Sequence, residues 1–133
     1  MDKFLQVPTR IHNVPRWEEH CRKIHARAID LIEGKISLMQ AAVEINKLAN
    51  WTLAGDDPDL AIFGKALFAS IGLPTGPERE YWSEAALERV APQIEAWEAR
   101  WRPLALEAAP RVVEKYRWAL AARQRRRGVG HAV

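Results

Sequence analysis

The stretch that decides the fold runs from Ser83 to Arg127 and reads SEAALERVAPQIEAWEARWRPLALEAAPRVVEKYRWALAARQRRR. Apolar residues recur in it at alternating steps of three and four, which is the spacing that holds one side of a helix against a partner. These residues are Leu87, Val90, Ile94, Trp97, Trp101, Leu104 and Ala108. The spacing predicts one long C-terminal helix and, with it, an all-α fold.

Three prolines interrupt this stretch, at Pro92, Pro103 and Pro110. An interior proline removes a backbone donor and pushes against the carbonyl one turn earlier. All three nevertheless fall on the face opposite the apolar seam, where water can satisfy the freed carbonyls and the helix can bend around its partner. We therefore expect a single proline-kinked helix; the alternative is two or three shorter helices that each begin at a proline.

The residues before Ser83 predict three more helices. Residues 1–15 hold Pro8 and Pro15, which favour an extended N-terminal arm. A helix follows over residues 16–33 and ends at Gly34. Ser37 and Gln40 form a capping box for a second helix, which should pair with the first as an antiparallel hairpin and stop at Asn50 in a left-handed conformation.

A third helix is expected from Pro58, with an aspartate cap before it, to Gly72. Its buried residues should be Leu60, Phe63, Leu67 and Ile71. The sequence thus predicts an antiparallel bundle of about four helices, with an extended arm over residues 1–15, a single helical domain over 16–127 and a flexible tail over 128–133.

The composition and the charge of the chain limit the classes of protein to which it can belong. The chain has 133 residues, of which 48% are hydrophobic and 28% charged, as is ordinary for one globular domain. Its formal net charge of +3 is uneven, because residues 111–133 carry seven Lys or Arg against Glu114 alone. Cys21 is the single cysteine, and neither a signal peptide nor an apolar span is recognisable, so we expect a cytoplasmic protein without an internal disulfide.

Few residues suggest chemistry. His20, Cys21 and His25 lie close together in the first helix but lack the further ligands of a zinc site, so we expect them to be structural. Asp56, Asp57 and Asp59 lack the other ligands of a calcium loop and are better explained by capping. No nucleophile motif and no phosphate-binding glycine loop is present. We expect no catalytic residues, metal or cofactor, and no enzymatic activity.

The best candidates for binding lie near the C-terminus. If the last helix continues, its outer side carries Arg111, Lys115, Trp118 and Arg125, with Arg126 beyond. Such a stripe can contact nucleic-acid phosphates and stack on a base, or meet an acidic protein surface. In the alternative interpretation, the cations complement the negative helix end and Trp118 packs under the N-terminal arm.

Six tryptophans are many for this length. Trp17, Trp97 and Trp101 fall on predicted core faces. Three others, Trp51, Trp82 and Trp118, match the buried face of a predicted helix less closely. Partly exposed tryptophans are the usual anchors of protein interfaces. We therefore expect a partner to contact these three residues, together with Arg79.

One group of residues resembles a family of small bacterial all-helical proteins. The run comprises Ile32, Gly34, Ile36, Ala41, Ala42, Asp56, Asp57, Pro58, Asp59, Phe63, Leu73, Pro74, Thr75, Gly76, Arg79, Trp82, Ala86, Leu87 and Glu98. Its most specific part is a Leu-Pro-x-Gly-x-x-Arg-x-x-Trp core made by Leu73, Pro74, Gly76, Arg79 and Trp82. The chain departs from the family pattern at residues 69–72, where the family has an acidic polar segment.

The resemblance implies a helical domain with no established enzymatic role, and some such proteins look like immunity partners of secreted bacterial toxins. Arg79 and Trp82 also have a structural interpretation, in which Arg79 bonds the carbonyls that end the third helix and Trp82 fills the gap beside the turn. Our expectation is a protein-binding module, most concretely an immunity-type inhibitor of a toxin. The alternative is a nucleic-acid-binding or regulatory protein that uses the basic C-terminal helix. Self-association as a homodimer is left open.

Overall fold

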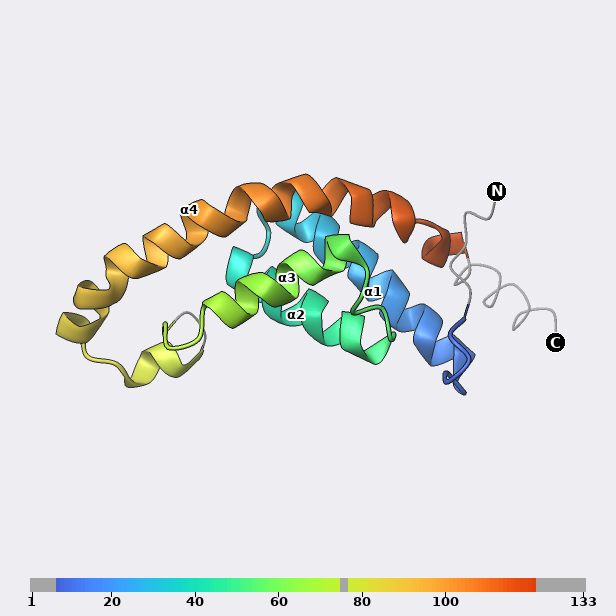
Figure 1. Ribbon diagram of the computed structural model, residues 1–133, viewed down its shortest axis with the longest axis horizontal. Helices are drawn as coiled ribbons and strands as arrows, with labels where there is room; N and C mark the ends of the chain where they lie inside the picture. Colours follow the sequence, from blue (N-terminus) through green and yellow to red (C-terminus); the bar gives the residue numbers. More distant parts are fainter. Residues whose placement is uncertain (1–6, 75–76, 122–133) are drawn as a thin grey trace.

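The computed structural model describes residues 7–74 and 77–121 of the chain. Its elements, in order, are α1 (Val14–Ile32), α2 (Leu38–Trp51), α3 (Pro58–Ala69), the 3₁₀ helix η1 (Pro77–Tyr81) and α4 (Glu84–Lys115). The part of the chain that is described contains no strand, so the predicted all-α class is confirmed. Figure 1 shows α4 arching over α1, α2 and α3, with η1 beneath its N-terminal end.

Helix α4 passes through all three prolines as one element of 32 residues. Pro92, Pro103 and Pro110 are all exposed, as predicted, so the carbonyls that lose a donor at these positions face water. The alternative of several shorter helices is wrong. The predicted C-terminal limit is also wrong, because α4 ends at Lys115 and a turn follows at Tyr116 and Arg117; residues 122–127 lie outside the described chain.

The buried side of α4 departs from the predicted seam in its second half. Trp97 and Ala108 are buried as expected, but Leu104 is 39% exposed and Ala105 is fully buried. A seven-residue repeat drifts by about 20° per heptad on a straight helix of 3.6 residues per turn. Over two heptads this drift amounts to about 40°, which is less than the roughly 100° between Leu104 and Ala105, so the packing against the partner helices also decides which residue faces inward. The seam continues along the chain through Ala109 and Val112.

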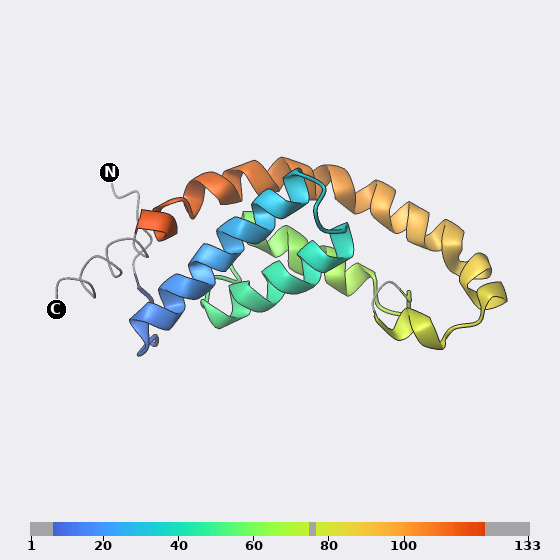
Figure 2. The same cartoon turned by 180° about the vertical axis from the view of Figure 1, so that it is seen from behind.

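Helices α1 and α2 form the hairpin that the sequence predicts. The apolar stripe of α1, from Trp17 to Leu31, is buried. The helix stops at Gly34, whose φ of 73° closes the turn while Lys35 N–H donates to the carbonyl of Asp30. Both halves of the Ser37 and Gln40 capping box are present. The two helices run in opposite directions in Figures 1 and 2.

Two expected helix ends are wrong. Asn50 stays helical, because α2 continues through Trp51 to a cap at Thr52, whose hydroxyl donates to the carbonyl of Leu48 at 2.8 Å. The left-handed residue is instead Leu53, with φ of 57°. Helix α3 begins as predicted, with Asp57 accepting from Asp59 N–H, but it ends at Ala69. Ile71 consequently falls in the following turn and is exposed instead of buried.

All four α-helices contribute to one apolar core. Helix α4 joins it in its second half, while residues 84–96 provide no fully buried side chain. Trp97 marks the boundary, where its indole N–H donates to the carbonyl of Ala66 on α3 at 2.8 Å. Of the predicted N-terminal arm over residues 1–15, residues 7–13 precede α1 without helix, whereas Val14 and Pro15 already belong to α1. Residues 1–6 lie outside the described residues. Over the described chain, no helix is long and apolar enough to cross a membrane.

Candidate functional site

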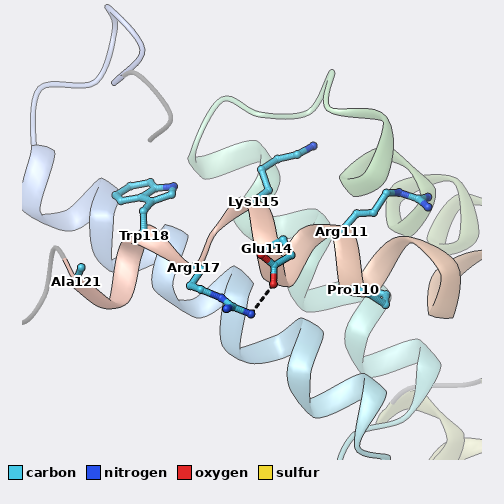
Figure 3. A pocket seen from close by; sticks show the side chains of 7 residues that line it. All are labelled: Pro110, Arg111, Glu114, Lys115, Arg117, Trp118 and Ala121. Atoms are coloured by element: carbon cyan, nitrogen blue, oxygen red, sulfur yellow. Dashed lines mark hydrogen bonds and ion pairs between the residues drawn. The ribbon is translucent and has the colours of Figure 1, made fainter. Parts of the chain in front are cut away.

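A groove beside the C-terminal end of α4 contains three of the predicted binding residues. Its volume is about 1010 Å³. The residues that line it are Pro110, Arg111, Glu114, Lys115, Arg117, Trp118 and Ala121. Figure 3 shows Arg111 and Lys115 pointing away from the side of the helix where Arg117 meets Glu114.

Two of the three cations that line this groove are paired with carboxylates at the start of α3, while Arg117 pairs with Glu114 of α4 itself. Arg111 Nε lies 2.8 Å from Asp59 Oδ1, and Lys115 Nζ lies 2.7 Å from Asp57 Oδ2. The hydrogen bond to Asp59 raises the pKa of Arg111 above its usual range. Helix α4 is thereby fastened to the N-terminus of α3. Arg111 and Lys115 lie on the same side of α4, as predicted. They do not form a free cationic surface, however, because together with Asp57 and Asp59 they make a cluster of ion pairs.

Trp118 does not lie on the outer side of α4 as expected. It is only 8% exposed, and its ring stacks on Trp17 of α1 with centroids 5.3 Å apart. The reason is the turn at Tyr116 and Arg117, which ends α4 before Trp118 and breaks the continuity of the stripe. The expected anchor is therefore an inter-helix core contact. Arg125 and Arg126 lie outside the described residues.

The other predicted binding residues lie apart from this groove and from one another. Trp51 is exposed at the end of α2, with its ring tilted against His20 at a centroid distance of 5.0 Å. Arg79 lies on η1 and Trp82 directly follows it, both exposed. No hydrogen bond from the Arg79 side chain to the end of α3 occurs within residues 7–74 and 77–121. In Figure 1 the end of α2 and η1 lie at opposite ends of the bundle.

Two of the most exposed apolar side chains lie near the end of α3, at the end of the bundle nearest η1. Phe68 is 76% exposed and Ile71 is 74% exposed. Phe68 borders two neighbouring grooves of about 500 and 540 Å³ and is shared by both, together with Asn46 and Gly64. We define the α2–α3 groove surface by the apolar residues around the first groove, which are Met39, Val43, Leu67, Phe68, Ile71 and Leu73.

Asn46 and Gly64 shape the shared edge of the two grooves. A Cβ at Gly64 would lie 2.8 Å from the Asn46 amide oxygen, so a larger residue at position 64 would require the Asn46 side chain to shift. Glu78 of η1 closes the first groove at its rim, and Lys65 borders the second. The result is an apolar centre with one aromatic ridge and a polar edge, which is the anatomy of a protein-binding surface.

Sequence reasoning missed this surface because it assigned Ile71 to the core and gave Phe68 no role. A signal was available in the composition of α3, where Asp59 and Lys65 are the only charged residues. A helix that is apolar on nearly all sides must either be enclosed or expose apolar side chains. In a bundle of this size the second outcome is the expected one.

The surroundings of His20, Cys21 and His25 on α1 shift the pKa of each side chain. Cys21 is fully buried, and burial raises the pKa of its thiol to about 12. Burial also lowers the pKa of His20 and of His25, with nearby cations adding to the effect. Among the residues described, no group of three or more His, Cys, Asp or Glu is placed to hold a metal ion.

No protein-family model, curated protein sequence or solved structure matches this chain. The resemblance built on Leu73, Pro74, Gly76, Arg79 and Trp82 therefore stays a prediction.

Proposed function

We propose that this chain is a non-enzymatic protein-binding module and that its α2–α3 groove surface is the binding site. The observation that carries the proposal is Phe68, a large aromatic side chain that projects between two grooves. Interface hot spots are typically aromatic residues at the centre of an apolar patch, surrounded by contacts that exclude water. A partner that fills both grooves would cover Phe68 on two sides.

The partner we propose is a different protein that presents apolar side chains to the grooves and polar groups to Glu78 and Lys65. Tyr81 and Trp82, which follow Glu78 in the sequence, are exposed as well and would extend the contact. The most concrete form of this function is inhibition of a toxin by covering its active surface, as the family resemblance implies. Trp82 and Arg79 keep a place in this proposal at the edge of the interface, whereas Trp118 does not.

The nucleic-acid alternative has less support. Of the cations it depends on, Arg111 and Lys115 are paired with carboxylates, and the tryptophan that would stack on a base is buried.

The test is a binding measurement with the product of the neighbouring gene as the first bait. We expect Phe68→Ala to weaken binding by about 2 kcal/mol or more, roughly thirtyfold, as for a hot-spot residue. Because Phe68 is mostly exposed, the variant should remain folded, which circular dichroism would verify. Leu106→Ala is the matched control, since Leu106 is a partly exposed apolar residue of α4 outside the grooves. Equal loss in both variants would contradict the assignment of the surface.

Sedimentation equilibrium distinguishes a foreign partner from self-association. A monomer that forms a stoichiometric complex with the bait supports the proposal. A stable homodimer that Phe68→Ala dissociates would mean that a second copy of the chain occupies the groove surface instead.

A further inference from the structure

The first half of α4, residues 84–96, carries a row of apolar side chains that are not fully buried, and we call this row the α4 apolar stripe. It consists of Leu87, Val90 and Ile94, at the spacing of three and four that places residues on one side of a helix. The same spacing leads on to Trp97, whose indole N–H bonds to α3. Within the described part of the chain, none of the three stripe residues packs against the core. The side of α4 that contacts α3 therefore continues as an apolar face beyond the contact.

A shared groove connects the α4 apolar stripe to the α2–α3 groove surface. The groove of about 540 Å³ is lined by Phe68 on α3 and by Trp101 on α4. Trp101 lies four residues after Trp97 and therefore on the same side of α4 as the stripe. In Figures 1 and 2, α3 and the first half of α4 diverge from their contact, and η1 lies near the N-terminal end of α4. Apolar side chains of α3 and of α4 thus border the same end of the molecule.

The end of the molecule that carries the α4 apolar stripe is acidic. Residues 77–96 contain five Glu against Arg79 and Arg89, which gives a net charge of −3. Since the whole chain carries +3, the other residues together carry +6. Four of the five carboxylates form no ion pair with any residue that the structure describes, and these are Glu80, Glu84, Glu88 and Glu95. The charge sets the kind of partner that this end attracts, because complementary charges steer the encounter of two proteins.

We propose that the partner docks through an amphipathic helix with basic flanks, which packs along the α4 apolar stripe and against Phe68. This inference rests on the proposed function and names the part of the partner that binds. Helices pack when their rows of side chains interlock, and the stripe is such a row, about 20 Å long over residues 84–96. Lysine or arginine beside the apolar face of the partner helix would lie next to the glutamates of this end. The contact would also support a half-helix that is marginally stable alone.

Labelled peptides test this class of partner directly. The lysine peptide has about 16 residues, with leucine at the i, i+3, i+4 and i+7 spacing, lysine on the flanks and alanine elsewhere. One control peptide replaces every lysine by glutamate, and the other replaces central alanines by proline, which breaks the helix and keeps the charge. We expect fluorescence anisotropy to show saturable binding of the lysine peptide to the full chain, and at least about tenfold weaker binding of either control. No saturable binding, or binding equal to that of either control, would overturn the proposal.

Two variants locate the lysine peptide on the chain. Val90→Ser interrupts the α4 apolar stripe and Phe68→Ala removes the aromatic ridge, and each should weaken binding by at least about fivefold. Neither side chain is fully buried, so both variants should remain folded. Ala96→Ser is the matched control, because Ala96 is exposed on the same half of α4 and lies away from the stripe. Unchanged affinity in Val90→Ser, or an equal loss in Ala96→Ser, would refute the stripe as the binding site.

Hydrogen exchange of the parent chain tests the same contact without a substitution. Bound lysine peptide should slow the exchange of amides in residues 84–96 by at least about fivefold and leave residues 105–115 unchanged, because only the first half of α4 would gain a new contact. Unchanged exchange over residues 84–96 at a saturating concentration of the peptide would overturn the proposal.

The proposed function and this inference fail in different ways. If Phe68→Ala weakens binding of the bait while the lysine peptide leaves the exchange of residues 84–96 unchanged, the α2–α3 groove surface binds a partner, but not through a basic helix. If the bait does not bind, the proposed function fails for that bait, and the peptide measurements alone decide whether this end of the molecule accepts a basic helix.

Discussion

Leu53 shows how a single residue ends a helix against its own conformational preference. Among the described residues it is the one non-glycine with a positive φ, and it occupies the position after the α2 cap where glycine is the usual choice. Its N–H donates to the carbonyl of Asn50, and the N–H of Ala54 donates to that of Ala49. The two bonds close the helix end, and the Cβ of Leu53 is held in a strained conformation by them.

Replacing Leu53 by glycine should relieve this backbone strain, which a comparison with alanine isolates from the loss of the leucine side chain. We expect Leu53→Gly to be more stable than Leu53→Ala by about 1 kcal/mol in urea unfolding, because both lose the outer side chain and only alanine keeps the strained Cβ. Equal stability of the two variants would show that the left-handed conformation carries no cost here.

Cys21 gives a second prediction at this scale, through pH. Burial raises its pKa to about 12 from an ordinary value of 9.0, so the unfolded chain loses the thiol proton first. Stability contributed by the neutral thiol is complete below about pH 9 and is lost as the pH rises toward 12. We expect the unfolding free energy to fall by about 1–2 kcal/mol between roughly pH 8 and pH 10.5, and to fall less steeply in Cys21→Ala. Identical slopes for the two proteins would contradict this origin.

At the scale of elements, α4 shows what repeat spacing predicts and where it fails. The prolines, the cap at Ser83 and the buried Trp97 follow from local sequence and are found as predicted. Leu104 is misplaced because repeat spacing shows which residues share a side of the helix, whereas the partner helices decide which side of α4 faces the core. Trp118 and Asn50 were misplaced for a similar reason, since the end of a helix depends on tertiary contacts.

The position of the inward side of α4 can be tested with one adjacent pair of residues. We expect Leu104→Ala to cost less than about 1 kcal/mol, as for an exposed position, and Ala105→Leu to cost about 1–3 kcal/mol by overpacking the core. Thermal denaturation would measure both. The heptad seam predicts the reverse order, so a larger loss for Leu104→Ala would restore it.

The candidate site was less predictable than the fold. Paired cations such as Arg111 and Lys115 look free in a sequence, because their partners Asp59 and Asp57 lie more than fifty residues away. Phe68 was overlooked because periodicity shows which residues share a face but not whether that face is covered. An apolar helix on the edge of a small bundle can only be recognised as exposed once its neighbours are placed.

At the scale of the whole molecule, α4 divides into a packed half and a free half. Its second half contacts α1 and α3, while Figures 1 and 2 show its first half extending past them with η1 at its tip. Trp97 is the first residue of the helix that is buried. The two halves differ in packing although their backbone is continuous.

Hydrogen exchange should follow that division. We expect amides of residues 84–96 to exchange at least about tenfold faster than those of residues 105–115, because local opening of the first half disrupts few buried contacts. Mass spectrometry of peptic fragments would resolve the two segments. Uniform protection along α4 would show that the helix opens only as a unit with the bundle, and would remove the distinction.

The overhang of α4 also affects how the chain behaves hydrodynamically. A helix of 32 residues is about 48 Å long, whereas a compact globule of this chain length has a radius of gyration of about 14 Å and measures about 36 Å across. Friction rises when a molecule departs from a sphere, so a lone copy should leave a sizing column early, at the position of a heavier standard. Light scattering, which reports mass without assuming a shape, is for that reason the appropriate way to count subunits in this protein.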